Sequence, residues 1–340
     1  MTLDLSFIIC TYNGARRLPE TLSHLALQAN LTRYSWEVLV IDNASTDGTS
    51  DVACEWLDRF PVSLEVIREN TPGKTHALKT GLRRARGRYF TIVDDDNHLC
   101  PDWVDVAVGF MDAHPMAGVI GGRIDPTFEA QAIIPRDFHE RYKGFLAIRD
   151  CGEEDKSEEM PIGAGMTGRT KLMSLLYERL GSYLSDRVGG GLGSCEDLEK
   201  SLIIQLLGWE VWYVQGLRMR HWIPQSRLTE EYIDRLWVEA AIADVWLGVL
   251  RNLGPTDHLG LRHLGARDRR LLRYETLRCC FPAWSARQKR ARFWRGYYEA
   301  RLRAYAEIER RSNEVSRILE FIRTASPDLR PEVSQKIELA

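Results

Sequence analysis

Three consecutive carboxylates, Asp94, Asp95 and Asp96, directly follow the apolar run Tyr89–Val93. Because side chains alternate between the two faces of a strand, Asp94 and Asp96 are expected to share one face. Adjacent carboxylates repel one another, and burial disfavours their charged form unless a cation compensates. A divalent ion such as Mg²⁺ or Mn²⁺, bridging carboxylates and substrate phosphates, would resolve that conflict. The alternative is a solvated acidic turn that caps the following helix.

Two further polar segments follow apolar runs. The loop 42–47, which begins with Asp42, comes after the run Trp36–Ile41, and its residues suit either an ordinary turn or part of a nucleotide site. The sequence Gly73-Lys74-Thr75 matches the end of a phosphate-binding loop, but Arg68 stands where that motif needs its first glycine. We therefore exclude a P-loop NTPase and keep Lys74 and Arg68 as candidates for contact with a phosphate.

Two acidic residues and one histidine complete the set of chemical candidates. Glu196 and Asp197 open an expected helix after a glycine-rich segment, 189–193. A carboxylate within reach of an acceptor hydroxyl could act as a general base, although acidic residues also simply stabilise the first turn of a helix. His221 follows a strand-like segment and is interpreted either as a ligand or as a hydrogen-bonded structural side chain.

The elements that must position these residues alternate along the first part of the chain. Buried apolar runs and helical periodicity follow one another, which predicts an open α/β sheet that binds ligands at the carboxyl ends of its parallel strands. After Pro224 the pattern is helical, with breaks expected at Gly254-Pro255 and Pro282. The expected strands are Leu5–Cys10, Trp36–Ile41, Leu64–Ile67, Tyr89–Val93 and Glu210–Val214, and the expected helices are 19–27, Thr49–Phe60, Thr75–Ala85 and Glu196–Leu207.

This pattern predicts two structural units. A catalytic domain is expected over residues 1–225, with a nucleotide-binding half of about 1–120 and an acceptor half of about 121–225. An arginine-rich helical extension is expected over residues 226–340. Its aromatic residues, among them Trp284, Phe293 and Trp294, either pack on the catalytic sheet or dip into an anionic membrane surface.

The composition is typical of a globular enzyme. The chain has 340 residues, of which 44% are hydrophobic and 28% charged, and this is enough to bury a sizeable core. A formal net charge of −2 and the lack of a reader motif argue against nucleic acid as a partner. Seven scattered cysteines without a pairing pattern predict reduced thiols and a cytosolic compartment. No run is apolar enough for a signal core or a membrane span, so we expect a cytoplasmic protein, free or peripheral on the inner face of the plasma membrane.

The order of these motifs resembles the family 2 glycosyltransferases of GT-A fold. The shared elements are a strand followed by Thr-Tyr-Asn-Gly, then Asp-Asn-Ala-Ser-Thr-Asp-Gly-Thr, Asn-x-x-Gly-Lys-x-x-Ala-Leu-x-x-Gly, Asp-Asp-Asp, Gly-x-Gly-Met and Glu-Asp. The resemblance covers residues 3–225 or so. Within that family, the segments Phe145–Arg149, Gly163–Gly165, Gly208–Tyr213 and His221–Pro224 resemble the bacterial hormogonium-polysaccharide type.

The resemblance implies a metal-dependent, inverting transfer of a sugar from a UDP- or GDP-sugar to a hydroxyl of a saccharide or lipid-linked saccharide. The ion would be Mn²⁺ or Mg²⁺. Because the middle acidic position, Asp95, also carries a carboxylate, the resemblance leaves open which two of the three carboxylates face the ligand. It assigns the donor to Thr11, Tyr12, Asn13, Asp42, Lys74, Asp94 and Asp95, the metal to Asp96, Asp94 and His221, catalysis to Asp197 with Glu196, and the acceptor side to Gly165, Met166 and Arg169.

Two other functions fit the same residues. A nucleotidyl- or phosphotransferase could use the same acidic metal site and would release pyrophosphate or a nucleotidylated product instead of a nucleoside diphosphate. A protein that only holds a sugar nucleotide is less consistent with the sequence, because both the acidic triplet and the Glu196-Asp197 pair are intact.

Overall fold

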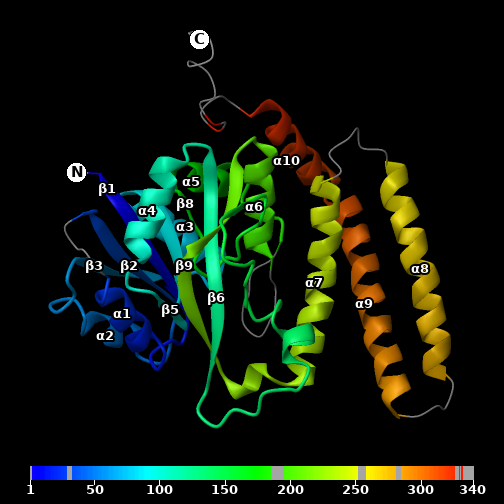
Figure 1. The fold of residues 1–340 in the computed structure, drawn as a ribbon. Helices are drawn as coiled ribbons and strands as arrows, with labels where there is room; N and C mark the ends of the chain where they lie inside the picture. Colours follow the sequence, from blue (N-terminus) through cyan, green and yellow to red (C-terminus); the bar gives the residue numbers. More distant parts are fainter. Residues whose placement is uncertain are drawn as a thin grey trace.

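The computed structural model describes residues 2–28, 33–184, 195–251, 258–280, 285–325, 329 and 331. Its centre is one nine-stranded sheet, in the order β3-β2-β1-β4-β8-β6-β9-β5, with β7 paired to β9 (Figure 1). The expected breaks at Gly254-Pro255 and Pro282 and the glycine-rich segment 189–193 lie outside the described residues.

The parallel half of the sheet agrees with the expectation from the apolar runs. It consists of β1 (Leu3–Thr11), β2 (Trp36–Asn43), β3 (Ser63–Glu69) and β4 (Gly87–Asp94). The pairs β1–β2, β1–β4 and β2–β3 are all parallel. Their carboxyl ends therefore meet at one edge of the sheet, and this edge carries the loops that begin at Tyr12, at Ala44 and after Asp94.

Apart from the first part of β9, the other half of the sheet was not expected from the sequence. It contains β5 (Asn97–Leu99), β6 (Ala117–Phe128), β7 (Lys156–Ser157), β8 (Thr167–Arg169) and β9 (Glu210–Ile223). The short strand β8 pairs antiparallel with both β4 and β6, whereas β6 and β9 are parallel to each other. The mixed sheet, with helices on both faces, agrees with the α/β architecture expected from the sequence (Figure 1). β9 is much longer than the expected strand Glu210–Val214, and it carries His221 to the edge of the sheet that also holds the acidic triplet.

Helices cover both faces of the sheet, because strand residues alternate between two cores. Ile8 belongs to one apolar cluster, and its neighbours Phe7 and Ile9 belong to the other. The cluster around Phe7 includes residues of α1 (Leu18–Ala26), α2 (Thr49–Cys54) and α4 (Trp103–Ala113), and that around Ile8 includes residues of α3 (Lys74–Arg84), α5 (Thr170–Arg179) and α6 (Glu196–Leu206). The expected helix Thr49–Phe60 is shorter than predicted, since turns follow Cys54.

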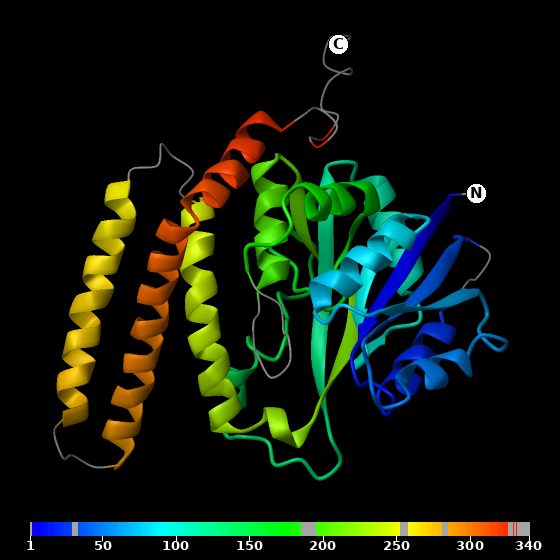
Figure 2. The same cartoon turned by 180° about the vertical axis from the view of Figure 1, so that it is seen from behind.

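The C-terminal part is helical beyond the last strand. A π-helical turn, Phe138–Tyr142, and a 3₁₀ turn, Gln225–Arg227, lie between the sheet and these helices. α9 runs between α7 and α8 on the side away from the parallel strands, and α10 crosses above α7 toward α6 (Figures 1 and 2). The four helices are α7 (Glu230–Arg251), α8 (His258–Cys280), α9 (Ser285–Arg310) and α10 (Ser312–Thr324).

One aromatic stack fastens these helices to the rest of the molecule. The rings of Tyr183 and Trp246 lie 4.0 Å apart and nearly parallel, and the Arg311 guanidinium lies 3.9 Å from the centre of the Tyr183 ring. Trp246 on α7 is completely buried. Six of the seven cysteines are free thiols: Cys10, Cys54, Cys100, Cys151, Cys195 and Cys279. None of the described helices is long and apolar enough to cross a bilayer.

Candidate active site

The ends of β1 and β2 form the first wall of the candidate site. The loop after β1 is held against the loop after β2, since the Asn13 backbone N–H donates to Ser45 Oγ at 2.9 Å and the Thr46 N–H donates to Asn13 Oδ1 at 2.9 Å. Asn13 has a positive φ of 49°, a conformation that asparagine tolerates better than most residues. Tyr12 next to it is 54% exposed, so its ring is available to a ligand.

Asp42 is buried beneath these loops. It is 1% exposed, accepts a hydrogen bond from the Ser45 N–H at 3.1 Å and another from Ser50 Oγ. The Arg68 guanidinium lies 3.6 Å from its second oxygen. Asp42 is therefore oriented from several sides, while Arg68 remains 56% exposed at the same rim of the site.

Asn43 holds the next loop in place. Its side-chain amide donates to the Thr71 carbonyl at 2.7 Å, and its Oδ1 accepts the Gly73 N–H at 2.7 Å. Because Gly73 immediately precedes α3, this contact fixes where the helix begins. Lys74, the first residue of α3, then reaches Asp94 at the end of β4, with 2.5 Å between Nζ and Oδ1.

The three adjacent carboxylates have different partners. Asp94 pairs with Lys74 and is partly exposed, whereas Asp95 turns toward α1. There Asp95 accepts hydrogen bonds from Arg17 Nε at 2.8 Å and from Thr11 Oγ1 at 2.6 Å. Burial, together with the neighbouring charge of Asp96, raises the pKa of Asp95 against the opposing effect of Arg17.

Asp96 lies in a cationic environment. His221 Nε2 is 3.5 Å from its Oδ1, and Arg227 NH1 is 3.3 Å from its Oδ2. Burial opposes the charged form of Asp96, but His221 and Arg227 outweigh it and hold the pKa of this carboxyl well below its usual range. Asp96 is thus a buried carboxyl, 4% exposed, beside an imidazole and a guanidinium.

The orientation of His221 fits a metal ligand. Its Nδ1 lies 2.7 Å from the Leu146 carbonyl oxygen, and a carbonyl can only accept, so Nδ1 carries the hydrogen. Nε2 is then the ring nitrogen that faces Asp96. A histidine whose other nitrogen donates to a backbone carbonyl is the arrangement that fixes a ligating imidazole. Arg227 NH1, 3.5 Å from Nε2, supplies a positive charge at the same place.

The acidic pair at the start of α6 faces the other side of the site. Asp197 Oδ2 accepts the Gly163 N–H at 2.6 Å, and its Oδ1 accepts the Leu198 N–H at 2.9 Å. Glu196 accepts a hydrogen bond from Thr75 Oγ1 at 3.0 Å. A Cβ on Gly163 would lie 3.1 Å from Asp197 Cβ, so the glycine allows this close approach.

Several expected contacts differ in the structure. Thr11 and Asp95, both expected at the donor, are bonded to each other and buried at 2% and 7% exposure. Met166, expected on the acceptor side, is 1% exposed and belongs to the apolar core. Gly165, with a φ of +74°, packs so closely that a Cβ would lie 2.9 Å from both Met219 Sδ and the Trp103 ring.

Arg169 lies at the wrong end of the sheet for an acceptor contact. It pairs with Tyr89, near the start of β4, whereas the acidic triplet follows the end of that strand. Its guanidinium donates to the backbone carbonyls of Ala117 and Pro115. The expected acceptor-side role of Arg169 is therefore corrected: the residue fastens the loop before β6.

Three residues of the site escaped the sequence analysis. Arg17 clamps Asp95, Asn43 holds the loop before α3, and Arg227 faces Asp96. Arg17 and Arg227 lie 78 and 131 residues from their partners in the chain. Asn43 was seen only as a turn residue.

Comparison with known protein families finds a match for the region that holds most of these residues. The family described as glycosyl transferase family 2 matches residues 6–171. This half of the chain is thus similar to family 2 glycosyltransferases. Asp197, His221 and Arg227 lie beyond the matched range.

Individual relatives match smaller parts of the chain. The poly(ribitol-phosphate) β-N-acetylglucosaminyltransferase TarS of Staphylococcus aureus strain Mu50 is 27% identical over 112 residues, which are 33% of this chain and 19% of TarS. The glycosyltransferase AglE of Haloferax volcanii is 26% identical over 124 residues, 36% of this chain and 40% of AglE. The chain thus spans well under half of either relative.

A solved structure resembles the fold over most of the chain. The mannosyltransferase PcManGT of Pyrobaculum calidifontis, solved with GDP-mannose and Mn²⁺, superposes with a TM-score of 0.51 at 21% identity and covers 91% of this chain and 87% of its own. At this identity the likeness concerns the fold alone.

Proposed function

We propose that this chain is an inverting, metal-dependent glycosyltransferase that moves a sugar from a UDP- or GDP-sugar to a hydroxyl of a saccharide or lipid-linked saccharide. The observation that carries the proposal is the placement of His221 beside Asp96, with 3.5 Å between Nε2 and Oδ1, and Asp96 lies in the half of the chain that matches glycosyl transferase family 2. In this proposal the catalytic domain extends over residues 1–225 and the helical extension over 226–340.

The donor would lie along the ends of β1, β2 and β4. Asp42 faces the base, Tyr12 and Asn13 contact the nucleoside, and Lys74 lies close enough to Asp94 to meet the diphosphate. Thr11 acts indirectly, because it is bonded to Asp95 and not open to the donor. Asp95 is likewise a positioning residue that Arg17 holds in place.

Asp96, Asp94 and His221 would hold Mn²⁺ or Mg²⁺. Oxygen ligands suit these hard ions, and one imidazole nitrogen completes a site of this kind. When bound, the ion neutralises charge on the departing diphosphate. Arg227, which faces Asp96 and His221, would add a second positive charge on the same side.

Asp197 would deprotonate the acceptor hydroxyl. Its two oxygens accept backbone N–H groups of Gly163 and Leu198, which fix the direction of the carboxylate without supplying it a counter-charge. A base so oriented removes the proton as the hydroxyl oxygen attacks the anomeric carbon, and the single displacement inverts that carbon. Glu196 accepts a hydrogen bond from Thr75 and would thereby hold the start of α6 against the start of α3.

The relatives give the proposal its substrate class. TarS is a transferase of N-acetylglucosamine to a polymer, and PcManGT was solved with a GDP-sugar and Mn²⁺. By this analogy the product is a polysaccharide or glycoconjugate of a bacterium, and the narrower hormogonium-polysaccharide type stays a prediction. A cytoplasmic location, free or on the inner face of the membrane, belongs to the same proposal.

The decisive experiment measures product from a panel of nucleotide-sugars in Mn²⁺, Mg²⁺ or EDTA. Nucleoside diphosphate released from one donor, only with metal present, together with a metal-dependent rise in Tm for that donor, is the expected result. Release of pyrophosphate from a nucleoside triphosphate, with no response to any nucleotide-sugar, would replace the proposal by a nucleotidyltransferase.

A further inference from the structure

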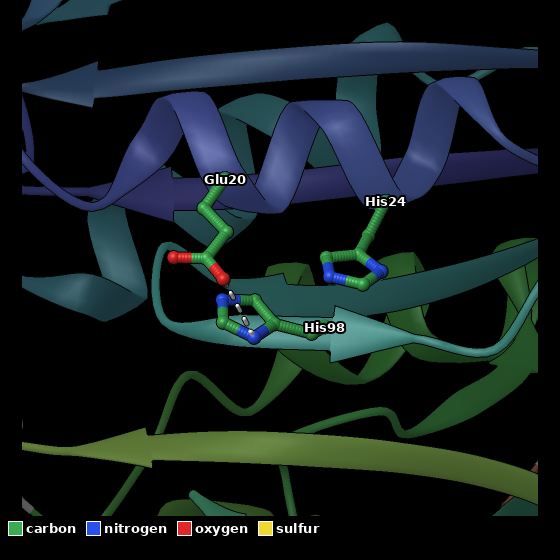
Figure 3. Close-up of side chains that lie close together, drawn as sticks. All are labelled: Glu20, His24 and His98. Carbon is green, nitrogen blue, oxygen red and sulfur yellow. Dashed lines mark ion pairs between the residues drawn. The ribbon is translucent and has the colours of Figure 1, made fainter. Parts of the chain in front are cut away.

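A second group of metal-binding side chains lies outside the site described above. Glu20 and His24 project from α1, and His98 projects from β5 toward them (Figure 3). One ligand atom from each of the three residues lies within 4.8 Å of the others. Glu20 Oε1 is 3.8 Å from His98 Nδ1. The cluster therefore joins two elements that are far apart in the chain.

The arrangement follows from the local geometry. Glu20 and His24 are four residues apart on a helix, so their side chains lie on the same face, and that face packs on β5. His98 is buried at 6% exposure. Among the residues that the structure describes, neither imidazole ring forms a hydrogen bond, so the ring nitrogens of both are available to a ligand.

We propose that Glu20, His24 and His98 bind Zn²⁺. Two imidazole nitrogens and one carboxylate oxygen are a ligand set that proteins use for zinc, with a fourth position left to water. The set differs in chemistry from the acidic triplet, whose oxygens suit Mg²⁺ or Mn²⁺. The two sites should accordingly prefer different ions, Zn²⁺ at Glu20, His24 and His98 and Mg²⁺ or Mn²⁺ at the acidic triplet.

Zinc binding requires one ring to turn. The His24 and His98 rings are stacked, with 4.8 Å between centroids and 13° between planes. A metal lies in the plane of each imidazole that binds it, so a stacked pair cannot share one ion. His24 is the ring that turns, because it is only partly buried on the outside of α1, and the exposed Glu20 follows it.

The positive charge of Arg220 disfavours binding of a cation at this site. Arg220 is the register partner of His98 in the antiparallel pair of β5 and β9, so both side chains lie on one face of the sheet. Its positive charge weakens the affinity for a divalent cation, and its removal should strengthen it.

The consequence concerns the acidic triplet. Arg17, whose guanidinium donates to Asp95, immediately precedes α1 and lies three residues before Glu20. His98 follows Asp96 by two residues. A zinc ion between α1 and β5 would tie together the two segments that hold the triplet. It would thus act as a structural brace and take no part in sugar transfer.

The test uses the full chain without any nucleotide-sugar, so that its outcome is independent of the proposed function. Zn²⁺ is titrated in excess Mg²⁺ by calorimetry and by the rise in Tm, and Co²⁺ serves as a spectroscopic substitute through its visible absorption. His24→Ala and His98→Ala should each weaken Zn²⁺ binding by about tenfold or more. Glu20→Gln should weaken it, and Arg220→Gln should strengthen it.

Two variants serve as controls. His139→Ala removes an exposed histidine elsewhere and should leave the affinity unchanged. Asp96→Asn should weaken the binding only slightly, because Asp96 acts on His98 through its charge and is not one of the three ligands. Unchanged Zn²⁺ affinity in His24→Ala, whose partly exposed side chain makes misfolding a poor explanation, would overturn the proposal, and so would loss of binding in Asp96→Asn alone.

Discussion

The Lys74 ammonium lies 2.5 Å from the Asp94 carboxylate, so the first residue of α3 is joined directly to the last residue of β4. Both side chains are about one third exposed. An ion pair so open to solvent contributes little to stability by itself. In the proposed reaction, the pair would present a cation beside the acidic triplet, where the diphosphate of the donor would bind.

Lys74→Ala should therefore weaken donor binding more than it alters folding. We expect the Kd for the donor, measured by calorimetry, to rise by about tenfold or more, since a charge-assisted contact to a phosphate is lost. The Tm without donor should change little. Lys79→Ala on the same helix is the matched control, and an equal loss in that variant would contradict a specific role of Lys74.

Asp96→Asn should strongly lower metal-dependent turnover. Without the Asp96 carboxylate, the metal that neutralises the departing diphosphate would be held less well, and kcat should fall by about 10² to 10³-fold. The donor should also cease to raise Tm in the presence of Mn²⁺. Asp125→Asn removes a half-exposed acidic side chain paired with Arg123 and should behave like the native protein. Full activity of Asp96→Asn would eliminate Asp96 as a ligand.

Asp197→Asn separates binding from chemistry. The amide keeps the shape of the side chain but cannot accept a proton, so transfer should fall by about 10² to 10⁴-fold. Donor binding and its dependence on Mn²⁺ should persist, because Asp197 contacts Gly163 and Leu198 and no residue of the proposed metal site. Parallel loss of donor affinity and turnover would point to a structural role instead.

Arg17→Ala should destabilise the fold through Asp95. The carboxylate is 7% exposed and accepts two hydrogen bonds from Arg17. Removing one partner of a buried pair costs about 3 kcal/mol of the free energy of unfolding, because the remaining charge has no compensation. Urea unfolding measures this loss. The double variant with Asp95→Asn should be more stable than Arg17→Ala alone, and equal stability would argue against the clamp.

Trp246→Ala tests how the helical extension is attached. The indole is fully buried and stacks on Tyr183, and its removal should cost about 3 to 5 kcal/mol. A protease should then degrade the helices α7 to α10 earlier than it degrades the sheet. Leu277→Ala on α8, where the side chain is 62% exposed, should change stability by less than about 0.5 kcal/mol. Equal protease resistance of both variants would contradict the role of the stack.

The sequence predicted the parallel strands well because each is a short, mostly apolar run between turn residues. It failed for β6, which contains Gly121, Gly122 and Pro126, and for β8, which has three residues. Both are strands only because neighbouring strands supply their hydrogen bonds, and such pairing over long distances leaves no local pattern.

The same limit applies to the candidate site. The acidic triplet, Lys74 and Asp197 could be predicted because each stands at the start or end of an element. Arg17 and Arg227 could not, because their relation to Asp95 and Asp96 depends on how the sheet closes. The opposite error concerns Met166 and Arg169, which the motif placed on the acceptor side because they follow one another closely in the sequence. In the structure, Met166 is buried in the core. Arg169 lies near the start of β4, at the opposite end of that strand from the acidic triplet.

Consecutive residues of α3 contact opposite sides of the site: Lys74 is bonded to Asp94, and Thr75 is bonded to Glu196 beside Asp197. A diphosphate that draws Lys74 away from Asp94 must also shift Thr75, and through it the start of α6. Binding of the donor would then move the first turn of α3 and, with it, the position of the general base Asp197. In that case the two substrates would bind in a compulsory order, the nucleotide-sugar first.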